Sequence, residues 1–488
     1  MHCIKKINFT IVFSLLVILV SLIDTVFAQG KTVLNDIQNA CKQDVDFFRK
    51  QLEDNSAPYA NNSDSHFRDW YSKGYEHVLQ LIGRIGDQDD CYYVMKYYIN
   101  GFDQSHISIR SYISLPAEQY PGILSAKKGD AHYIIYKHDD IDYLKDISPG
   151  DRVTHINGID IEVFYKDYLL PFYANDKSEL TLVAASIYSL IIDGNRFKPI
   201  PKTITVIHDN KPITVTLKYI DFSGDAVLAA KKLRQPGLTD DFKIEMLSNG
   251  VWIKIPSFFP AREQVIYFVG MLARLKDDIA KEDFILFDLR SNRGGSTKWS
   301  IPIIRNLWGD AYIKSLGQKH DYNRQWIKKI RISKDNFDSF SNEYSQAAIK
   351  SYISSLTKGE PFFLKKWSIF NDNDNLYSNN DDNPIKVKIY VLTDNFCRST
   401  CWNFVKELKQ IPGVIHIGQS TTIQSIYSYA KQVRAPSEYF DFFYPTQLRV
   451  QPQNNLTTAL VPSYIYDKDW QDEPAIINWV LSITENFK

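Results

Sequence analysis

Three short segments, far apart in the 488-residue sequence, hold the residue types needed for acyl transfer. Ser399 follows a β-rich run, His106 lies in a turn after Gly101, and Gly294 and Gly295 follow another apolar run. A serine hydroxyl attacks a carbonyl when an imidazole takes its proton, and backbone amides bind the oxyanion that forms. The three segments together hold the groups that a serine hydrolase needs, with Ser399 as a candidate nucleophile and His106 as a candidate base.

The backbone around the glycines and the serine predicts the oxyanion donors. Phe284 to Leu289 is almost continuously apolar, as in a strand covered on both faces, and a glycine-bearing turn follows it. Ser399 directly precedes a helical pattern over Thr400–Leu408. Glycine lets the backbone approach a ligand closely, and a helix N-terminus favours an anion. We therefore expect Gly294, Gly295 and Thr400 to supply the oxyanion amides.

Each residue also has a structural interpretation when it is taken alone. Ser399 could cap the helix that follows it. A lone histidine such as His106 is usually a structural residue, and many strands end in two glycines. The order of the segments along the chain is what favours the catalytic interpretation.

This order resembles the tail-specific, or carboxyl-terminal processing, peptidase family, which includes the tricorn core and interphotoreceptor retinoid-binding proteins. The run from Asp288 to Gly295 matches the family pattern D-L-R-x-N-x-G-G in full. The C-x-S-x-C segment of secreted bacterial members is similar to Cys397–Cys401, and their G-Q-x-T segment is similar to Gly418–Thr421. The resemblance implies a serine-type endopeptidase that cleaves polypeptides.

Two catalytic designs occur in this family. The processing proteases use a lysine as base, but the matching position here is Gln424, and Lys431 is out of register. The tricorn-like design uses a histidine in an S-H turn, which His106 matches. We therefore expect a Ser–His pair, with Glu438 or Asp441 as the carboxylate that orients the imidazole. No cofactor is implied, and the histidines do not have metal-ligand spacing.

The missing lysine also supports an alternative, a catalytically inactive protein that binds peptides or other ligands on the same scaffold. The retinoid-binding relatives show that this scaffold serves binding as well as hydrolysis. Lys+Arg and Asp+Glu both number 57, so no global field attracts nucleic acid. The expected partner is a polypeptide substrate.

The first residues resemble a targeting segment. Lys5 and Lys6 precede an apolar stretch over residues 7–23, and Val26-Phe27-Ala28 fits a cleavage site. We expect residues 1–28 to be a signal peptide and the mature chain to be exported, either periplasmic or secreted. No later segment is apolar and long enough to span a bilayer.

Four cysteines remain after the signal peptide, as expected for two disulfides in an oxidising compartment. Four cysteines allow three pairings. The simplest pairing joins Cys41 to Cys91 and Cys397 to Cys401, which brackets Ser399. The alternative is four buried free thiols.

The remaining chain predicts a multi-domain α/β protein, or α+β in the wider sense. We expect a helical domain over 29–118, a PDZ-like β module over 119–222, and a ClpP/crotonase-like α/β peptidase core over 223–488. The core carries a polar, irregular insertion at about 310–384, which could serve as a lid. Its Asn/Asp clusters do not match an EF-hand, so we interpret them as loops.

The PDZ-like interpretation depends on one segment. Ile147 to Gly158 contains a P-G-D turn, a short strand and an Asn-Gly end, as in PDZ modules, which bind peptides by strand addition. Any hairpin with an Asn-Gly turn would have this pattern. Residues 171–196 would then be an insertion or an altered carboxylate-binding loop.

Overall fold

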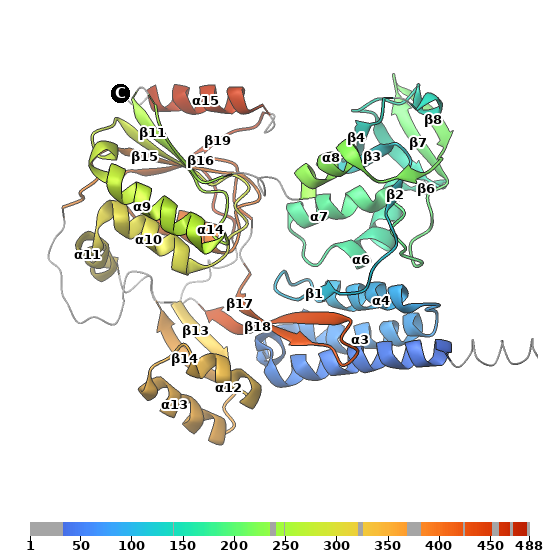
Figure 1. Cartoon of the computed structure of the whole chain (residues 1–488), viewed down its shortest axis with the longest axis horizontal. Helices are drawn as coiled ribbons and strands as arrows, with labels where there is room; N and C mark the ends of the chain where they lie inside the picture. The colour runs from blue at the N-terminus through green and yellow to red at the C-terminus, as the bar shows by residue number, and fades with distance from the viewer. Residues whose placement is uncertain are drawn as a thin grey trace, which may run out of the picture.

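The structure is a computed structural model of the whole chain. It describes residues 33–139, 141–234, 241–247, 249–320, 326–367, 382–422, 425–450, 458–468 and 472–485. The predicted signal peptide lies outside these ranges. In the described part, no helix combines the length and hydropathy needed to cross a membrane. Figure 1 shows an α/β core, a separate β-rich module and a layer of N-terminal helices below the β-rich module.

The α/β core is built on a largely parallel sheet. Its strand order is β10-β11-β12-β15-β16-β19, and β10 alone of these pairs antiparallel to its neighbour. The strands are β10 (Lys243–Met246), β11 (Gly250–Lys254), β12 (Phe284–Asp288), β15 (Lys388–Thr393), β16 (Val414–Gly418) and β19 (Tyr464–Ile465). The predicted strand-helix-strand unit is present, because β15, α14 (Thr400–Leu408) and β16 follow one another.

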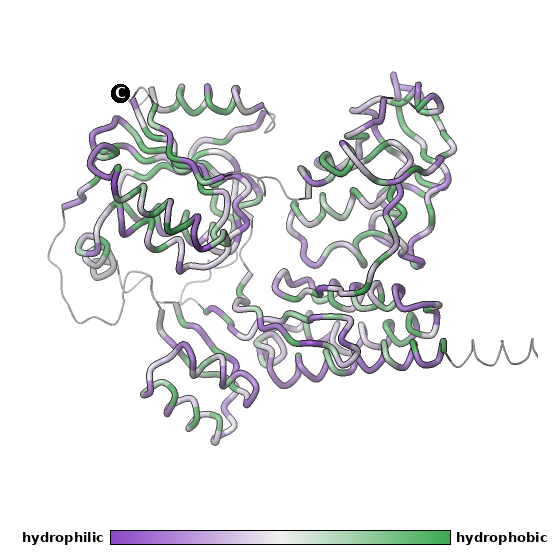
Figure 2. Tube along the Cα trace, viewed as in Figure 1, coloured by the Kyte–Doolittle hydropathy of each residue, from purple (hydrophilic) through white to green (hydrophobic). Residues whose placement is uncertain are grey.

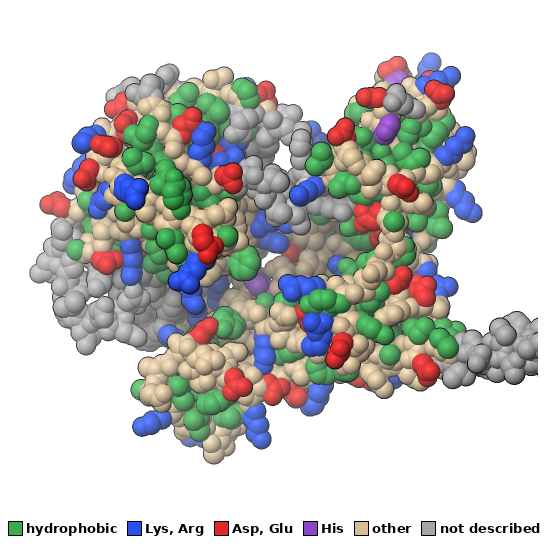
Figure 3. Space-filling view, in the orientation of Figure 1, with side chains coloured by type: hydrophobic (Ala, Val, Ile, Leu, Met, Phe, Trp, Pro, Cys, Tyr) green, Lys and Arg blue, Asp and Glu red, His purple; other side chains and the backbone are tan. Residues whose placement is uncertain are grey.

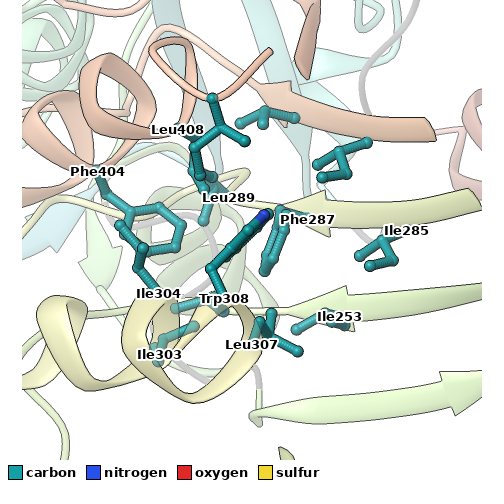
Figure 4. Close-up of a cluster of buried hydrophobic side chains, with 14 of the residues drawn as sticks. Ile253, Ile285, Phe287, Leu289, Ile303, Ile304, Leu307, Trp308, Phe404 and Leu408 are labelled. Carbon is teal, nitrogen blue, oxygen red and sulfur yellow. The ribbon is translucent and has the colours of Figure 1, made fainter. Parts of the chain in front are cut away.

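Helices cover both faces of this sheet. α9 (Arg262–Ile279), α10 (Thr297–Trp308) and α14 pack on one face, and α15 (Glu473–Glu485) packs on the other. Every residue of β12 is buried, as its continuous apolar run predicts. At its centre Phe287 lies 6.3 Å from Trp308 and 5.9 Å from Phe404, ring centroid to ring centroid (Figure 4). In Figure 2 the hydrophobic, green parts of the tube gather in the same core.

A second sheet pairs an early strand of the chain with strands from its second half. It contains β1 (Ser108–Ser111), β13 (Trp326–Arg331), β14 (Phe362–Trp367), β17 (Tyr427–Arg434) and β18 (Phe440–Val450). The long strand β18 pairs antiparallel with β1, β13 and β17. Strand β1 therefore lies beside residues that come more than three hundred positions later in the sequence.

The N-terminal helices pack against this second sheet. They comprise the helix over residues 33–55, α2 (Ala57–Ala60), α3 (Ser65–Ile82) and α4 (Gln88–Asn100). Phe48 lies 4.7 Å from Phe442 of β18, and Tyr444 belongs to the same buried cluster. The helical layer thus shares a hydrophobic core with strand β18, although we expected a domain of its own.

The predicted irregular insertion is largely ordered, so that part of the expectation is wrong. It contains α11 (Asp310–His320), β13, α12 (Lys334–Ser341), α13 (Gln346–Thr357) and β14. Phe340 stacks on Tyr344 and packs against Tyr352 and Phe363, which gives the segment a small core. The polar composition of the insertion hid this core, because β13 and β14 pair with each other and β13 also pairs with the distant strand β18. The first Asn/Asp cluster, residues 371–375, lies outside the described residues.

The β-rich module follows β1. Its strands are β2 (Gln119–Tyr120), β3 (Ile123–Lys128), β4 (Ala131–Lys137), β5 (Arg152–Ile156), β6 (Ile159–Asp160), β7 (Thr203–His208), β8 (Lys211–Thr216) and β9 (Ile220–Asp221). Its helical pieces are η1 (Asp142–Leu144), α5 (Ile161–Phe164), η2 (Tyr165–Leu169), α6 (Leu170–Tyr173), α7 (Glu179–Ser186), η3 (Ile187–Ser189) and α8 (Gly224–Arg234). The expected Asn-Gly turn joins β5 to β6, with positive φ at Asn157 and Gly158. The stretch over 171–196 is mainly helical.

Two disulfides form, and they join the pairs that the simplest sequence interpretation proposes. Cys41 binds Cys91, which ties the helix over 33–55 to α4. Cys397 binds Cys401 across the turn between β15 and α14.

We predict that replacing Cys41 and Cys91 by alanine lowers the free energy of unfolding by about 4 kcal/mol, because the bond closes a loop of about 50 residues. The Cys397→Ala/Cys401→Ala pair removes the same atoms but a far shorter loop, so about 2 kcal/mol is expected. Urea denaturation followed by circular dichroism measures both. An equal loss in the two variants would contradict the loop-entropy explanation.

Candidate active site

The glycine turn and the serine turn meet at one edge of the core sheet. β12 and β15 are parallel neighbours with Asp288 opposite Leu392, so the segments after them emerge at the same edge. A Cβ on Gly294 would lie 2.6 Å from the Arg398 carbonyl oxygen and 2.8 Å from both the Ser399 Cβ and the Thr400 nitrogen. The contact leaves no room for a side chain, which is the reason for glycine at position 294.

Ser399 adopts a strained backbone conformation at this contact. Its φ is 55° and its ψ is −119°, where residues other than glycine are rarely found. Such a conformation costs about 1–3 kcal/mol, so the surrounding structure must hold it. Ser399 occupies the N-cap position, yet its side chain makes no capping hydrogen bond to the described first turn of α14. The helix-capping interpretation is therefore wrong.

Neighbouring contacts hold this turn. The Cys397–Cys401 disulfide spans it, and Thr400 Oγ1 donates a hydrogen bond of 2.6 Å to the Gly295 carbonyl. Asp394 accepts from the Ser291 amide at 2.7 Å and from the Phe396 amide at 3.0 Å. Asp394 thereby links the glycine turn to the serine turn. Burial raises the pKa of this carboxyl to about 7.

One member of the expected set of oxyanion donors, Gly294, has another hydrogen-bond partner. The Gly294 amide donates to Asn292 Oδ1 at 2.9 Å, and Asn292 Nδ2 donates to the Ile255 carbonyl at 2.8 Å. Because the Gly294 amide already donates to the buried Asn292 side chain, the prediction that Gly294 is an oxyanion donor is wrong. Gly294 instead allows the close contact between the two backbone turns. Gly295 and Thr400 remain candidates, and the Thr400 amide at the start of α14 has no partner within that helix.

His106 reaches this region through the second sheet. It lies two residues before β1, whose Ser108 pairs with Phe443 of β18. Burial, together with the charges of Arg449 and Arg398, lowers the pKa of His106 to about 4. The charge of Arg398, the residue that precedes Ser399, therefore acts on His106. Its Nδ1 atom is 3.4 Å from Ser105 Oγ.

One loop, residues 174–178, bridges the histidine turn and the serine turn. Asn175 Nδ2 donates to the Ile107 carbonyl at 3.4 Å, and Lys177 pairs with Asp103 at 2.6 Å. Asp176 forms an ion pair of 3.7 Å with Arg398, and its charge raises the pKa of His106. Sequence reasoning missed Asp176, because nothing in its local sequence distinguishes it from other loop carboxylates.

The two predicted orienting acids have other roles. Asp441 accepts from Tyr112 Oη at 2.6 Å, from Gln432 Nε2 at 2.6 Å and from Arg434 Nε at 2.9 Å. Glu438 is exposed in the hairpin between β17 and β18. The prediction that Asp441 or Glu438 orients His106 is therefore wrong. The Asp441 carboxylate already binds side chains of the second sheet and its edge, and the Glu438 side chain is exposed to solvent.

The lysine design gains no candidate from the described residues. Gln424 lies outside the described ranges. Lys431 Nζ donates to the Asp335 carbonyl at 2.5 Å and to Asn336 Oδ1 at 3.3 Å, so it supports α12. Arg449 is a further residue that sequence reasoning missed. It donates to Asn403 Oδ1 of α14 at 3.5 Å and lies close enough to affect His106.

Known proteins share the fold of this chain. No curated protein matches the sequence significantly. The structure of mature CPAF is similar, with a TM-score of 0.57 at 13% identity over 88% of this chain and 93% of that chain. Mature CPAF complexed with lactacystin is similar with a TM-score of 0.56, at 13% identity over 88% and 94%. These likenesses show a shared fold.

A match to a known family lies within the sequence of the core. Residues 251–437 match the model of peptidase family S41. This segment includes both the glycine turn and Ser399, the two parts that meet at the edge of the sheet. Residues 251–437 are therefore similar to peptidase family S41.

Proposed function

We propose that this protein is a serine-type peptidase that cleaves polypeptides by acyl transfer from Ser399. The observation that carries the proposal is the strained backbone of Ser399, held against Gly294 at the carboxyl ends of β12 and β15. Strain of this kind gathers at functional sites and exposes a nucleophile between a strand and a helix. A structural serine at this position would have no reason to adopt it.

In the proposed mechanism Ser399 attacks the substrate carbonyl and His106 accepts the hydroxyl proton. The carbonyl oxygen becomes an oxyanion, which the amides of Gly295 and Thr400 stabilise. His106 then returns the proton to the leaving amine, and a water molecule repeats the sequence to release the acyl group. Asp176 is the described carboxylate whose charge favours the imidazolium form of His106.

One observation favours a second candidate, a non-catalytic binding protein. The guanidinium groups of Arg398 and Arg449 disfavour a positive charge on His106, and the proposed mechanism needs that charge to form. A peptide-binding protein would need no proton acceptor. The experiments below separate the two candidates.

We also propose that the protein acts outside the cytoplasm. Two disulfides, Cys41–Cys91 and Cys397–Cys401, fit an oxidising compartment, either the periplasm or the extracellular medium. The β-rich module over 119–222 would present substrate to the core in the manner of PDZ modules.

Replacing Ser399 by alanine should lower kcat by about 10⁶-fold, because the acyl-enzyme can no longer form. A fluorophosphonate probe should label the wild-type protein at Ser399 and leave the variant unlabelled. Ser354→Ala, at an exposed serine on α13, is the matched control and should retain both properties. Peptide binding by a wild-type protein that neither hydrolyses nor reacts would favour the binding protein instead.

Gly294→Ala should lower kcat/KM by about 10²–10³-fold, because the new Cβ displaces Ser399 and Thr400 from the positions that stabilise the oxyanion. Gly309→Ala is the control, since Gly309 also has a positive φ but would place its Cβ in open space. Steady-state kinetics on a quenched fluorescent peptide measures both variants. Similar losses in the two would show that backbone strain, rather than the contact with Ser399, limits activity.

The pH profile should reflect the low pKa of His106. The neutral imidazole is the base, and its pKa of about 4 keeps it neutral at higher pH. We expect kcat/KM to stay high as pH falls to about 5 and to be half lost near pH 4. Asp394 also titrates, near pH 7, so Asp394→Asn is measured in parallel. A loss centred near pH 6.5 that persists in Asp394→Asn would contradict the assignment of His106 as base.

A further inference from the structure

The turn that carries Ser399 lies between a cavity on one side and the hydrophobic core on the other. Arg398 lines a cavity of about 320 Å³ beside the turn. The surface is hollowed between the α/β core and the N-terminal helices (Figure 3). Cys397 and Cys401 flank Ser399, and both are fully buried in the core cluster that also contains Phe404. The disulfide therefore joins the two ends of the turn on its core side.

This bond restricts the segment from Cys397 to Cys401 to closed conformations. The two Cα atoms are 5.3 Å apart, whereas an extended chain would place them roughly 13 Å apart. Disulfides accept Cα separations of only about 4.4–6.8 Å. Ser399 is at the centre of the closed segment, so the bond excludes every rearrangement of its φ and ψ that opens the turn.

Ser399 needs such a constraint because its backbone conformation, with φ of 55° and ψ of −119°, is unfavourable for a serine. The bond favours the closed turn because it removes the open conformations that compete with it. Its contribution for so short a loop is similar in size to the cost of the Ser399 conformation. The oxidation state of the two cysteines is therefore sufficient to decide which conformation Ser399 adopts.

Hydrogen bonds hold the two ends of the turn separately. Thr400 Oγ1 donates to the Gly295 carbonyl at 2.6 Å, which fixes the start of α14. The Thr422 amide donates to the Cys397 carbonyl at 3.0 Å, which fixes the chain before the turn. The disulfide is the covalent link between these two ends.

We propose that the Cys397–Cys401 disulfide is a redox switch for the nucleophile, because the oxidised turn holds Ser399 in its reactive conformation and the reduced turn releases it. A dithiol reduces the bond by supplying two electrons and two protons, which yields two cysteine thiols and the cyclic disulfide of the reductant. The inference rests on the proposed peptidase function and adds its regulation. The chain is inactive while these cysteines are reduced and becomes active in an oxidising compartment.

Burial of the two cysteines determines when the switch acts. Thiol–disulfide exchange needs contact between an attacking thiolate and a sulfur atom. Neither cysteine side chain has exposed surface in the folded protein. The bond therefore forms as the chain folds, and afterwards it is reduced only when the turn opens locally.

The first experiment uses the two disulfides to separate positioning from stability. Cys397→Ala/Cys401→Ala should lower both kcat and the rate of fluorophosphonate labelling at Ser399 at least about tenfold, with a smaller change in KM. Cys41→Ala/Cys91→Ala is the matched control, because it removes the longer loop and the larger share of stability. This control should retain the wild-type kcat. Equal kcat in the three proteins, or a greater loss in the control, would overturn the proposal.

The second experiment changes the oxidation state of the wild-type protein, so it does not depend on the folding of a variant. Dithiothreitol is added in urea below the unfolding transition, where local opening exposes buried sulfur atoms. Alkylation and mass spectrometry follow each cysteine pair separately, while circular dichroism follows folding. Activity should fall in proportion to the thiols at Cys397 and Cys401 with an unchanged circular dichroism spectrum, and oxidised glutathione should restore it. Full activity in the reduced protein, or loss only on unfolding, would contradict the switch.

Hydrogen exchange separates the failure of this inference from the failure of the peptidase function, because it needs no hydrolysis. The Asn403 amide donates to the Ser399 carbonyl at 3.0 Å and so reports on the turn. It should exchange at least about tenfold faster in Cys397→Ala/Cys401→Ala than in the wild type. If the wild type cleaves nothing but this difference is found, the positioning by the bond is supported and the peptidase proposal fails. If the wild type cleaves peptides and the variant has the same kcat, the switch is overturned and the peptidase proposal stands.

Discussion

The site depends on the contact between two backbone turns, at Gly294 and at Ser399. Parallel pairing of β12 and β15 brings both turns to one edge of the sheet, and glycine alone leaves enough space for them to touch. The contact holds Ser399 in a conformation that an isolated peptide would leave. The buried strands, the disulfide of Cys397 and Cys401 and the links through Asp394 all stabilise this one arrangement.

Around this contact the electrostatic environment is predominantly positive. The charges of Arg398 and Arg449 act to lower the pKa of His106, and the charge of Arg398 also lowers the pKa of Arg293. Asp176 is the carboxylate that moderates these charges near both His106 and Arg398. The same positive field that disfavours an imidazolium would favour an oxyanion.

The histidine depends on structure far from the core sheet. β1 fixes the direction of the chain after His106 by pairing with β18, and the N-terminal helices hold β18 through Phe48 and Phe442. The loop over 174–178 contacts both the turn that contains His106 and the turn that contains Ser399. Because helices, β-rich module and core each supply a part, the candidate site forms only when all three have folded together.

The sequence by itself determined the features that depend on neighbours along the chain. The apolar run of β12, the helix that begins at Thr400, the Asn157-Gly158 turn and the D-L-R-x-N-x-G-G pattern are all local, and each could be predicted. The sequence alone could not predict the contacts between distant segments. Nothing near Asp441 reveals that Tyr112 and Arg434 already occupy its carboxylate, and nothing near Asp176 marks it as the acid beside His106. The tertiary structure decided which charges surround the nucleophile, because Coulomb forces depend on distance in space and the chain order does not specify that distance.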